Sequence, residues 1–73
     1  MSSPPPAPIP NSDAGLYDDL VEVLRRHPAF GYEARQQTIE YICKVYREEG
    51  AVAGRARLLL VINMLRGDLG DEH

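Results

Sequence analysis

Apolar residues recur at helical spacing in the first two thirds of the chain. The first set predicts a helix over about residues 13–27, with an apolar face made of Leu16, Leu20, Val23, Leu24 and His27. The second set predicts a helix over about residues 32–49, with a stripe at i, i+3, i+4 and i+7 made of Ile39, Ile42, Cys43 and Tyr46. Ser12 and Asp13 suit the N-cap of the first helix, Pro28 ends it, and Gly50 suits the position after the second.

A third apolar stretch, Leu-Leu-Leu-Val-Ile over residues 58–62, is unbroken and fits a buried strand as well as a helix. A helix is favoured because Leu58, Ile62 and Leu65 continue the helical spacing and no second strand is evident. We therefore expect a small-residue hinge at 51–54 and a helix over about 55–66, ended by Gly67. Two other helices cannot cover five consecutive apolar residues, so this run is either a central core helix or partly an exposed binding patch.

These three elements predict one small all-α, three-helix domain over residues 13–67. Residues 1–12 hold five of the six prolines, which predicts a flexible or polyproline-like tail with Ile9 as its only large apolar anchor. That tail is interpreted as either an inert end or a docking strand, and the acidic residues 68–73 are expected to fray. With no basic residue before Arg25 and a single cysteine, the chain lacks a secretory pattern and predicts a cytoplasmic protein; no apolar run reaches the length of a membrane span.

Charge is segregated along the chain more strongly than the net value of −3 indicates. Residues 1–22 carry −4 and residues 67–73 carry −3, whereas residues 23–66 carry eight bases and four acids, or +4. Seven of the eight bases are arginine, which favours planar, paired recognition of carboxylate or phosphate groups. This distribution indicates a binding protein with a basic centre.

Catalytic and metal-binding patterns are missing from the sequence. Cys43 lies on the apolar stripe of the second predicted helix and is interpreted as a buried small hydrophobe. His27 precedes a proline at a helix end, where the helix dipole favours it, and His73 is terminal. There is no glycine-rich phosphate loop, zinc motif or calcium loop. We therefore expect no enzymatic activity, no cofactor and no metal.

Direct DNA binding is the weaker of two binding hypotheses. The second helix, Gly50 and the third helix resemble a helix-turn-helix in outline, but a reading helix needs polar side chains and only Arg55 and Arg57 could provide them. A protein-binding module fits better, because such surfaces combine apolar anchors with arginine and tyrosine. The candidate partner-binding residues are Ile9, Tyr17, Arg25, Arg26, Tyr41, Arg55 and Arg57, and Tyr41 is expected to be the most exposed tyrosine. The oligomeric state stays open.

The short length, the opening MSSPPPAPIP and the arginine-rich helical middle give a chain that resembles the small RNA-polymerase-binding transcription regulators of lytic phages. The resemblance implies binding to the largest subunits of the host polymerase near the RNA exit channel. It also implies inhibition of initiation at host promoters and antitermination. No motif carries residue roles across, so the candidate residues rest on the pattern alone. A helical adaptor or antitoxin-like module for another protein is the alternative.

Overall fold

The computed structural model describes residues 9–70, and within that span the chain forms three α-helices, one short 3-10 helix and no strand. This confirms the all-α, three-helix fold class. The 3-10 helix η1 (Asn11–Asp13) leads into α1 (Ala14–Arg26), a loop connects α1 to α2 (Tyr32–Glu49), and α3 spans Ala51–Leu69. The bounds predicted for α2 are confirmed, and those for α1 differ by one residue at each end. The predicted tail and acidic end fall largely on residues 1–8 and 71–73, outside the described residues.

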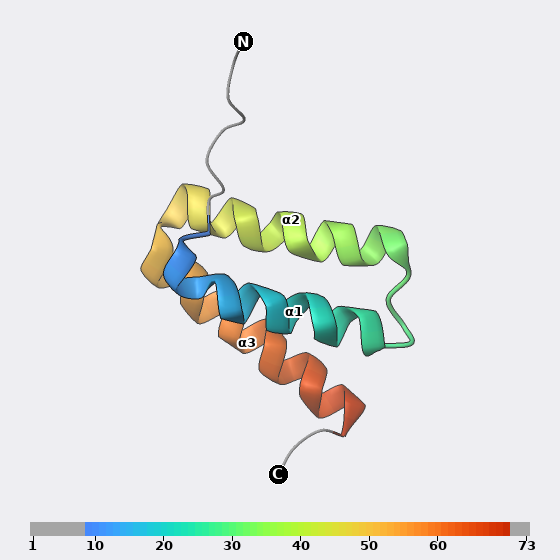
Figure 1. The fold of residues 1–73 in the computed structure, drawn as a ribbon. Coiled ribbons are helices and arrows are strands. Elements are labelled where there is room, and N and C mark those ends of the chain that lie inside the picture. Colours follow the sequence, from blue (N-terminus) through green and yellow to red (C-terminus); the bar gives the residue numbers. More distant parts are fainter. Residues whose placement is uncertain (1–8, 71–73) are drawn as a thin grey trace.

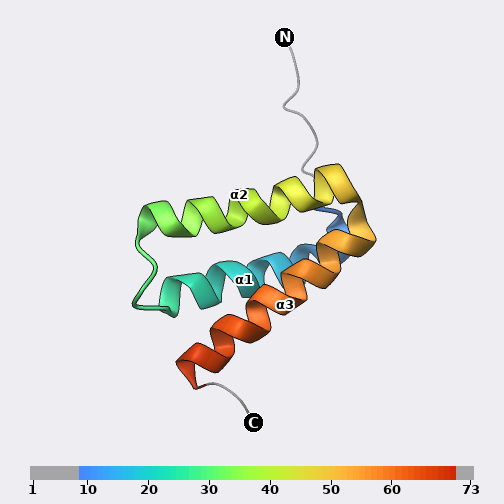
Figure 2. The ribbon, with the colours of Figure 1, turned by 180° about the vertical axis from the view of Figure 1, so that it is seen from behind.

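The helix α3 organises the core. Figures 1 and 2 show α1 and α2 running antiparallel, with α3 lying obliquely across α1 and diverging from α2 toward its C-terminal end. α3 contacts both other helices more extensively than they contact each other. The buried core consists of Leu20, Val23, Leu24, Ile42, Tyr46, Leu58, Ile62 and Leu65. No helix within residues 9–70 is both long and apolar enough to cross a bilayer.

The predicted hinge at 51–54 is wrong, because this segment forms the first turn of α3. Gly50 alone reverses the chain, with φ of 96° and ψ of 172°, a conformation that residues with a Cβ rarely adopt. Its N–H donates to the carbonyl oxygen of Tyr46 at 3.2 Å, and the Gly54 N–H donates to the Gly50 carbonyl at 2.9 Å. One glycine therefore ends α2 and begins α3.

The predicted end of the third helix at Gly67 is also wrong, because α3 continues through Asp68 to Leu69. Gly67 lies in an open position where the helix tolerates it, at a free-energy cost of about 1 kcal/mol relative to alanine. The helix ends instead at Gly70, whose left-handed φ of 75° is typical of a C-terminal glycine cap. The first residues of the expected frayed end, 68 and 69, are therefore helical.

The run at 58–62 is divided between core and surface. Leu58 and Ile62 are buried and Val61 is half-buried, whereas Leu59 and Leu60 are exposed. The two interpretations of this run, central core and exposed patch, each hold for part of it.

A buried carboxylate joins η1 to the end of the bundle where α2 meets α3. Asp13 is only 2% exposed; Tyr46 Oη donates to its Oδ2 at 2.8 Å, and Arg55 Nε donates to its Oδ1 at 2.9 Å. Asp13 occupies the N-cap position of α1 as predicted, but its side chain makes no cap hydrogen bond. We call the trio of Asp13, Tyr46 and Arg55 the clamp.

The clamp also explains Gly54. A Cβ at this position would lie 2.5 Å from the Cγ and Cδ1 atoms of Tyr46, so the ring of Tyr46 packs directly on the backbone of α3. Burial, and then the hydrogen bond to Asp13, raise the pKa of Tyr46 to about 12, which keeps its hydroxyl protonated as the donor.

Candidate functional site

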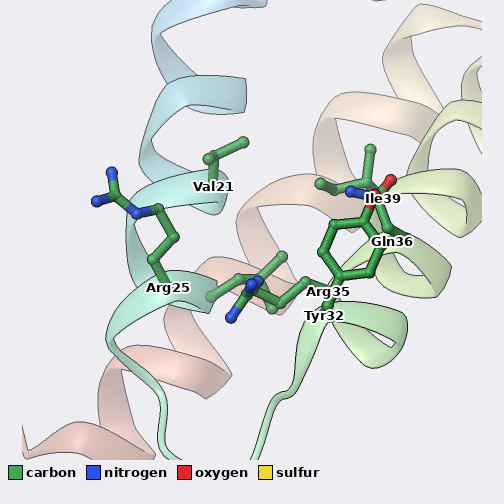
Figure 3. A pocket seen from close by; sticks show the side chains of 7 residues that line it. Val21, Arg25, Tyr32, Arg35, Gln36 and Ile39 are labelled. Carbon is green, nitrogen blue, oxygen red and sulfur yellow. The ribbon is translucent and has the colours of Figure 1, made fainter.

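A groove opens between α1 and α2 near the loop that joins them. α1 contributes Val21, Leu24 and Arg25 to its lining, and α2 contributes Tyr32, Arg35, Gln36 and Ile39. Its volume is about 220 Å³. α1 and α2 each pack mainly on α3 and less on each other, which leaves room for a groove along their own seam. Figure 3 shows the groove, with Val21 and Arg25 on α1 and the other labelled residues on α2.

The groove combines an apolar floor with cationic and aromatic walls. Val21 and Ile39 are half-buried and present apolar surface at the base, above the fully buried Leu24. Arg25 is exposed at the wall, and Tyr32, at 70% exposure, is among the most exposed large hydrophobic side chains of residues 9–70. Arginine and tyrosine around a small apolar pocket are the residue types that dominate protein-binding hot spots.

One arginine of the groove is held in place by the loop. Arg35 Nη1 donates to the carbonyl oxygen of Phe30 at 3.3 Å, and Phe30 packs against the core. Figure 3 shows the Arg35 side chain extending from α2 into the space between the two helices. This anchoring restricts the side chain, so less conformational entropy is lost when its remaining N–H groups bind an acceptor. The groove can therefore bind a segment that carries a carboxylate beside an apolar side chain.

The loop end of the bundle is joined to α3 by polar contacts at the surface. His27 Nε2 lies 3.4 Å from Asp68 Oδ2, and the carboxylate of Asp68 is 65% exposed. His27 Nδ1 accepts the N–H of Ala29 at 3.2 Å, which places the proton of the neutral ring on Nε2, where it faces Asp68. The His27 ring also packs edge-on against Phe30 at a centroid distance of 4.9 Å. The predicted role of His27 as a helix-terminal residue agrees with its place at the C-cap of α1.

The candidate partner-binding residues predicted from the sequence lie in three parts of the fold: at the groove and the adjoining end of α1, on the other side of α2, and in contacts within the domain. Arg25 lies on the groove, and Arg26 follows it at the exposed end of α1. Tyr41 and Arg57 lie together on the other side of α2, where the Arg57 guanidinium carbon sits 5.9 Å from the centre of the Tyr41 ring. Tyr41 is exposed as predicted, but Tyr32 is more exposed.

The other three candidates make contacts within the fold. Ile9 packs against the core, and Arg55 donates to Asp13 in the clamp. Tyr17 is half-buried, and burial together with the neighbouring Cys43 raises its pKa. Cys43 itself is half-buried rather than fully buried, and burial raises its pKa. Ile9, Tyr17 and Arg55 therefore support the shape of the domain.

Tyr32, Arg35 and Gln36 were not among the predicted site residues, although a signal for them exists. Together with Ile39 they fall at i, i+3, i+4 and i+7, and on α1 the groove residues Val21, Leu24 and Arg25 fall at i, i+3 and i+4. These are two facing stripes, but most members are polar or amphipathic. A search for apolar periodicity passes over such a stripe.

The link between α2 and α3 differs from that of a helix-turn-helix. A single residue, Gly50, joins the helices, whereas the DNA-binding motif has a turn of about three or four residues. Of the two basic residues that could read bases, Arg55 donates to Asp13 within the chain, whereas Arg57 lies beside the ring of Tyr41 with its N–H donors available. A recognition helix presents polar side chains from its first turn, whereas the first turn of α3 contains the small apolar residues 51–53.

Among residues 9–70, no three His, Cys, Asp or Glu side chains cluster closely enough to hold a metal ion. Comparison of the chain with protein-family models, curated proteins and solved structures gives no match. What the groove between α1 and α2 can bind is therefore inferred from its geometry and residues alone.

Proposed function

We propose that this protein is a small protein-binding regulator that binds bacterial RNA polymerase, inhibits transcription initiation and promotes antitermination. The observation that carries the binding role is the groove, where Arg25, Arg35 and the exposed Tyr32 surround an apolar floor. The choice of polymerase as the partner rests on the resemblance to small phage regulators. The protein then acts in the bacterial cytoplasm, where the polymerase is found.

The chemistry of the groove specifies what the partner presents. Two guanidinium groups favour a carboxylate, and the floor between them favours a neighbouring apolar side chain. Tyr32 adds a rigid ring that can cover that side chain with little loss of conformational entropy. An acidic segment with one apolar anchor on the polymerase surface meets these requirements.

The proposal is tested by co-elution of the protein with purified bacterial polymerase and by transcription from host promoters and through terminators. We expect a complex at micromolar concentration, fewer initiation events and more readthrough. Arg25→Glu combined with Tyr32→Ala should weaken binding about tenfold or more, because both side chains are exposed groove walls. Lys44→Glu, an exposed charge reversal on α2 outside the groove, is the matched control. Absence of a complex at low salt contradicts the proposal.

A helical adaptor for another protein is the second candidate, and the same groove supports it. It predicts that the Arg25→Glu and Tyr32→Ala changes abolish capture of one non-polymerase protein, while the polymerase is not retained. An affinity pull-down with both variants, followed by mass spectrometry, separates the two candidates.

A further inference from the structure

A second unpartnered surface lies on the side of α2 and α3 away from the groove. It contains two separate depressions of about 290 and 270 Å³, both lined by residues of α2 and α3. We call it the α2–α3 face, and it includes Tyr41, Arg57, Leu60, Val61, Met64 and Asp68. Figure 2 shows α2 and α3 diverging toward the C-terminal end of α3.

The centre of the α2–α3 face is apolar and exposed. Met64 is 61% exposed and Leu60 is 48% exposed, and Val61 between them is half-buried. These side chains come from successive turns of α3, so they form a continuous strip rather than scattered surface residues. Such a strip gains free energy when it is covered.

The charges on this face have a twofold arrangement. Arg57 and Asp68 flank the apolar strip at opposite ends, 11 residues apart in α3, which is ~16 Å along the helix axis. If two copies of α3 pack antiparallel with their centre between Val61 and Met64, each Val61 faces the Met64 of the other copy. The same arrangement places each Arg57 opposite the Asp68 of the other copy. The face is therefore complementary to itself in both charge and hydrophobicity, which is the requirement for an isologous interface.

The contact between Arg57 and Tyr41 restricts this side chain before it meets a partner. The guanidinium carbon lies 5.9 Å from the centre of the Tyr41 ring, and such a cation–π contact leaves the N–H groups able to donate to a carboxylate. At the other end, Asp68 keeps most of its carboxylate exposed beside His27. We propose that the α2–α3 face is a homodimer interface, formed by two antiparallel α3 helices and two reciprocal Arg57–Asp68 pairs.

This dimer is independent of the proposed polymerase-binding function, because the groove between α1 and α2 uses different residues on another side of the bundle. It gives the protein two identical grooves. Loss of the dimer and loss of polymerase binding are therefore separable outcomes.

Sedimentation equilibrium of the full chain, from micromolar to submillimolar concentration, tests the proposal. We expect the mass to rise with concentration from the 8.2 kDa of one chain to twice that value. Arg57→Glu should weaken dimerisation about tenfold or more, since it introduces two like-charge contacts at once. Met64→Glu should abolish the dimer, and its helicity should stay unchanged because Met64 is exposed.

The charge arrangement is tested by exchanging the two charges, which should restore dimerisation. Arg57→Glu with Asp68→Arg should recover most of the dimer affinity, since the exchanged charges face each other again. Arg47→Glu, an exposed arginine of α2 that lines neither depression, is the control and should dimerise like the unaltered protein. A monomer at every concentration overturns the proposal, as does a folded Met64→Glu variant that still dimerises or an exchange variant that fails to recover.

Discussion

The two ends of the bundle are held together by different physical means. At the end where α2 meets α3, the clamp surrounds a carboxylate that is 2% exposed with hydrogen bonds of 2.8 and 2.9 Å. At the end where the loop joins α1 to α2, the polar contact between His27 and Asp68 is 3.4 Å long, with the carboxylate 65% exposed. Buried, charge-assisted hydrogen bonds contribute several times more to stability than exposed ion pairs do.

The groove lies at the weakly joined end. There the α1–α2 seam is less filled and the arginine and tyrosine side chains are available to a partner. A domain this small has a low free energy of unfolding. Because the strong contacts are concentrated at one end, the side chains at the other end are available for binding.

Asp13→Ala should lower the free energy of unfolding by about 2–4 kcal/mol, the largest effect of a single polar substitution in this protein. The change leaves the buried hydroxyl of Tyr46 without its acceptor and Arg55 without its partner. Urea unfolding followed by circular dichroism measures it. Asp13→Asn keeps a hydrogen-bond acceptor and should lower the free energy of unfolding by less. A decrease below about 0.5 kcal/mol for Asp13→Ala would show that the clamp does not stabilise the fold.

Raising the pH through the folded pKa of Tyr46, which is raised to about 12, should lower the free energy of unfolding by up to about 3 kcal/mol. The folded state therefore holds this proton more tightly than the unfolded state does. The associated stability is present below pH ~10 and is lost as the pH rises through the folded value. Comparing the unfolding free energy of the protein with that of Tyr46→Phe between neutral and alkaline pH isolates this loss. Parallel pH profiles for the two proteins would refute it.

Gly54→Ala should destabilise the protein by about 1–2 kcal/mol, because the new Cβ would overlap the Tyr46 ring and this strain outweighs the better helix propensity of alanine. Gly67→Ala in the same helix is the matched control. It meets no atom within 4 Å and should stabilise the protein by about 0.5–1 kcal/mol. Thermal unfolding of both variants measures the difference, and equal shifts in the midpoint would contradict the close packing of Tyr46 on α3.

At protein concentrations where the chain is monomeric, Asp68→Asn at the loop end should change the unfolding free energy by less than about 0.5 kcal/mol, because the contact to His27 is long and exposed. The urea midpoint of this variant, measured beside that of Asp13→Ala, gives the contrast between the two ends directly. A loss comparable to that of Asp13→Ala would remove the distinction.

The helices were predictable because their apolar faces follow the helical period. The sequence predicts α2 over Tyr32–Glu49 and the buried positions Leu20, Leu24, Ile42 and Leu58. The start of α3 was not predictable from composition. Small residues at 51–54 resemble a hinge, but a single left-handed Gly50 completes the turn and lets them form a helix.

The candidate site was only partly predictable. Arg25 is predicted from its residue type in the basic middle of the chain, whereas Tyr32 and Arg35 belong to a stripe of mixed polarity that apolar periodicity does not detect. Arg55 has the same residue type as Arg25, yet it contacts a buried carboxylate 42 positions away. Such a pairing depends on how η1 folds back on α3, and local pattern contains no information about it.

Native-state hydrogen exchange of the backbone amides tests the contrast between the two ends most directly. We predict that amides near the clamp, in the second half of α2 and the first half of α3, exchange only through global unfolding. Amides of the loop between α1 and α2 and of the last turns of α3 should open at a smaller free energy. Equal protection at both ends, or lower protection near Tyr46 than near His27, would contradict the account.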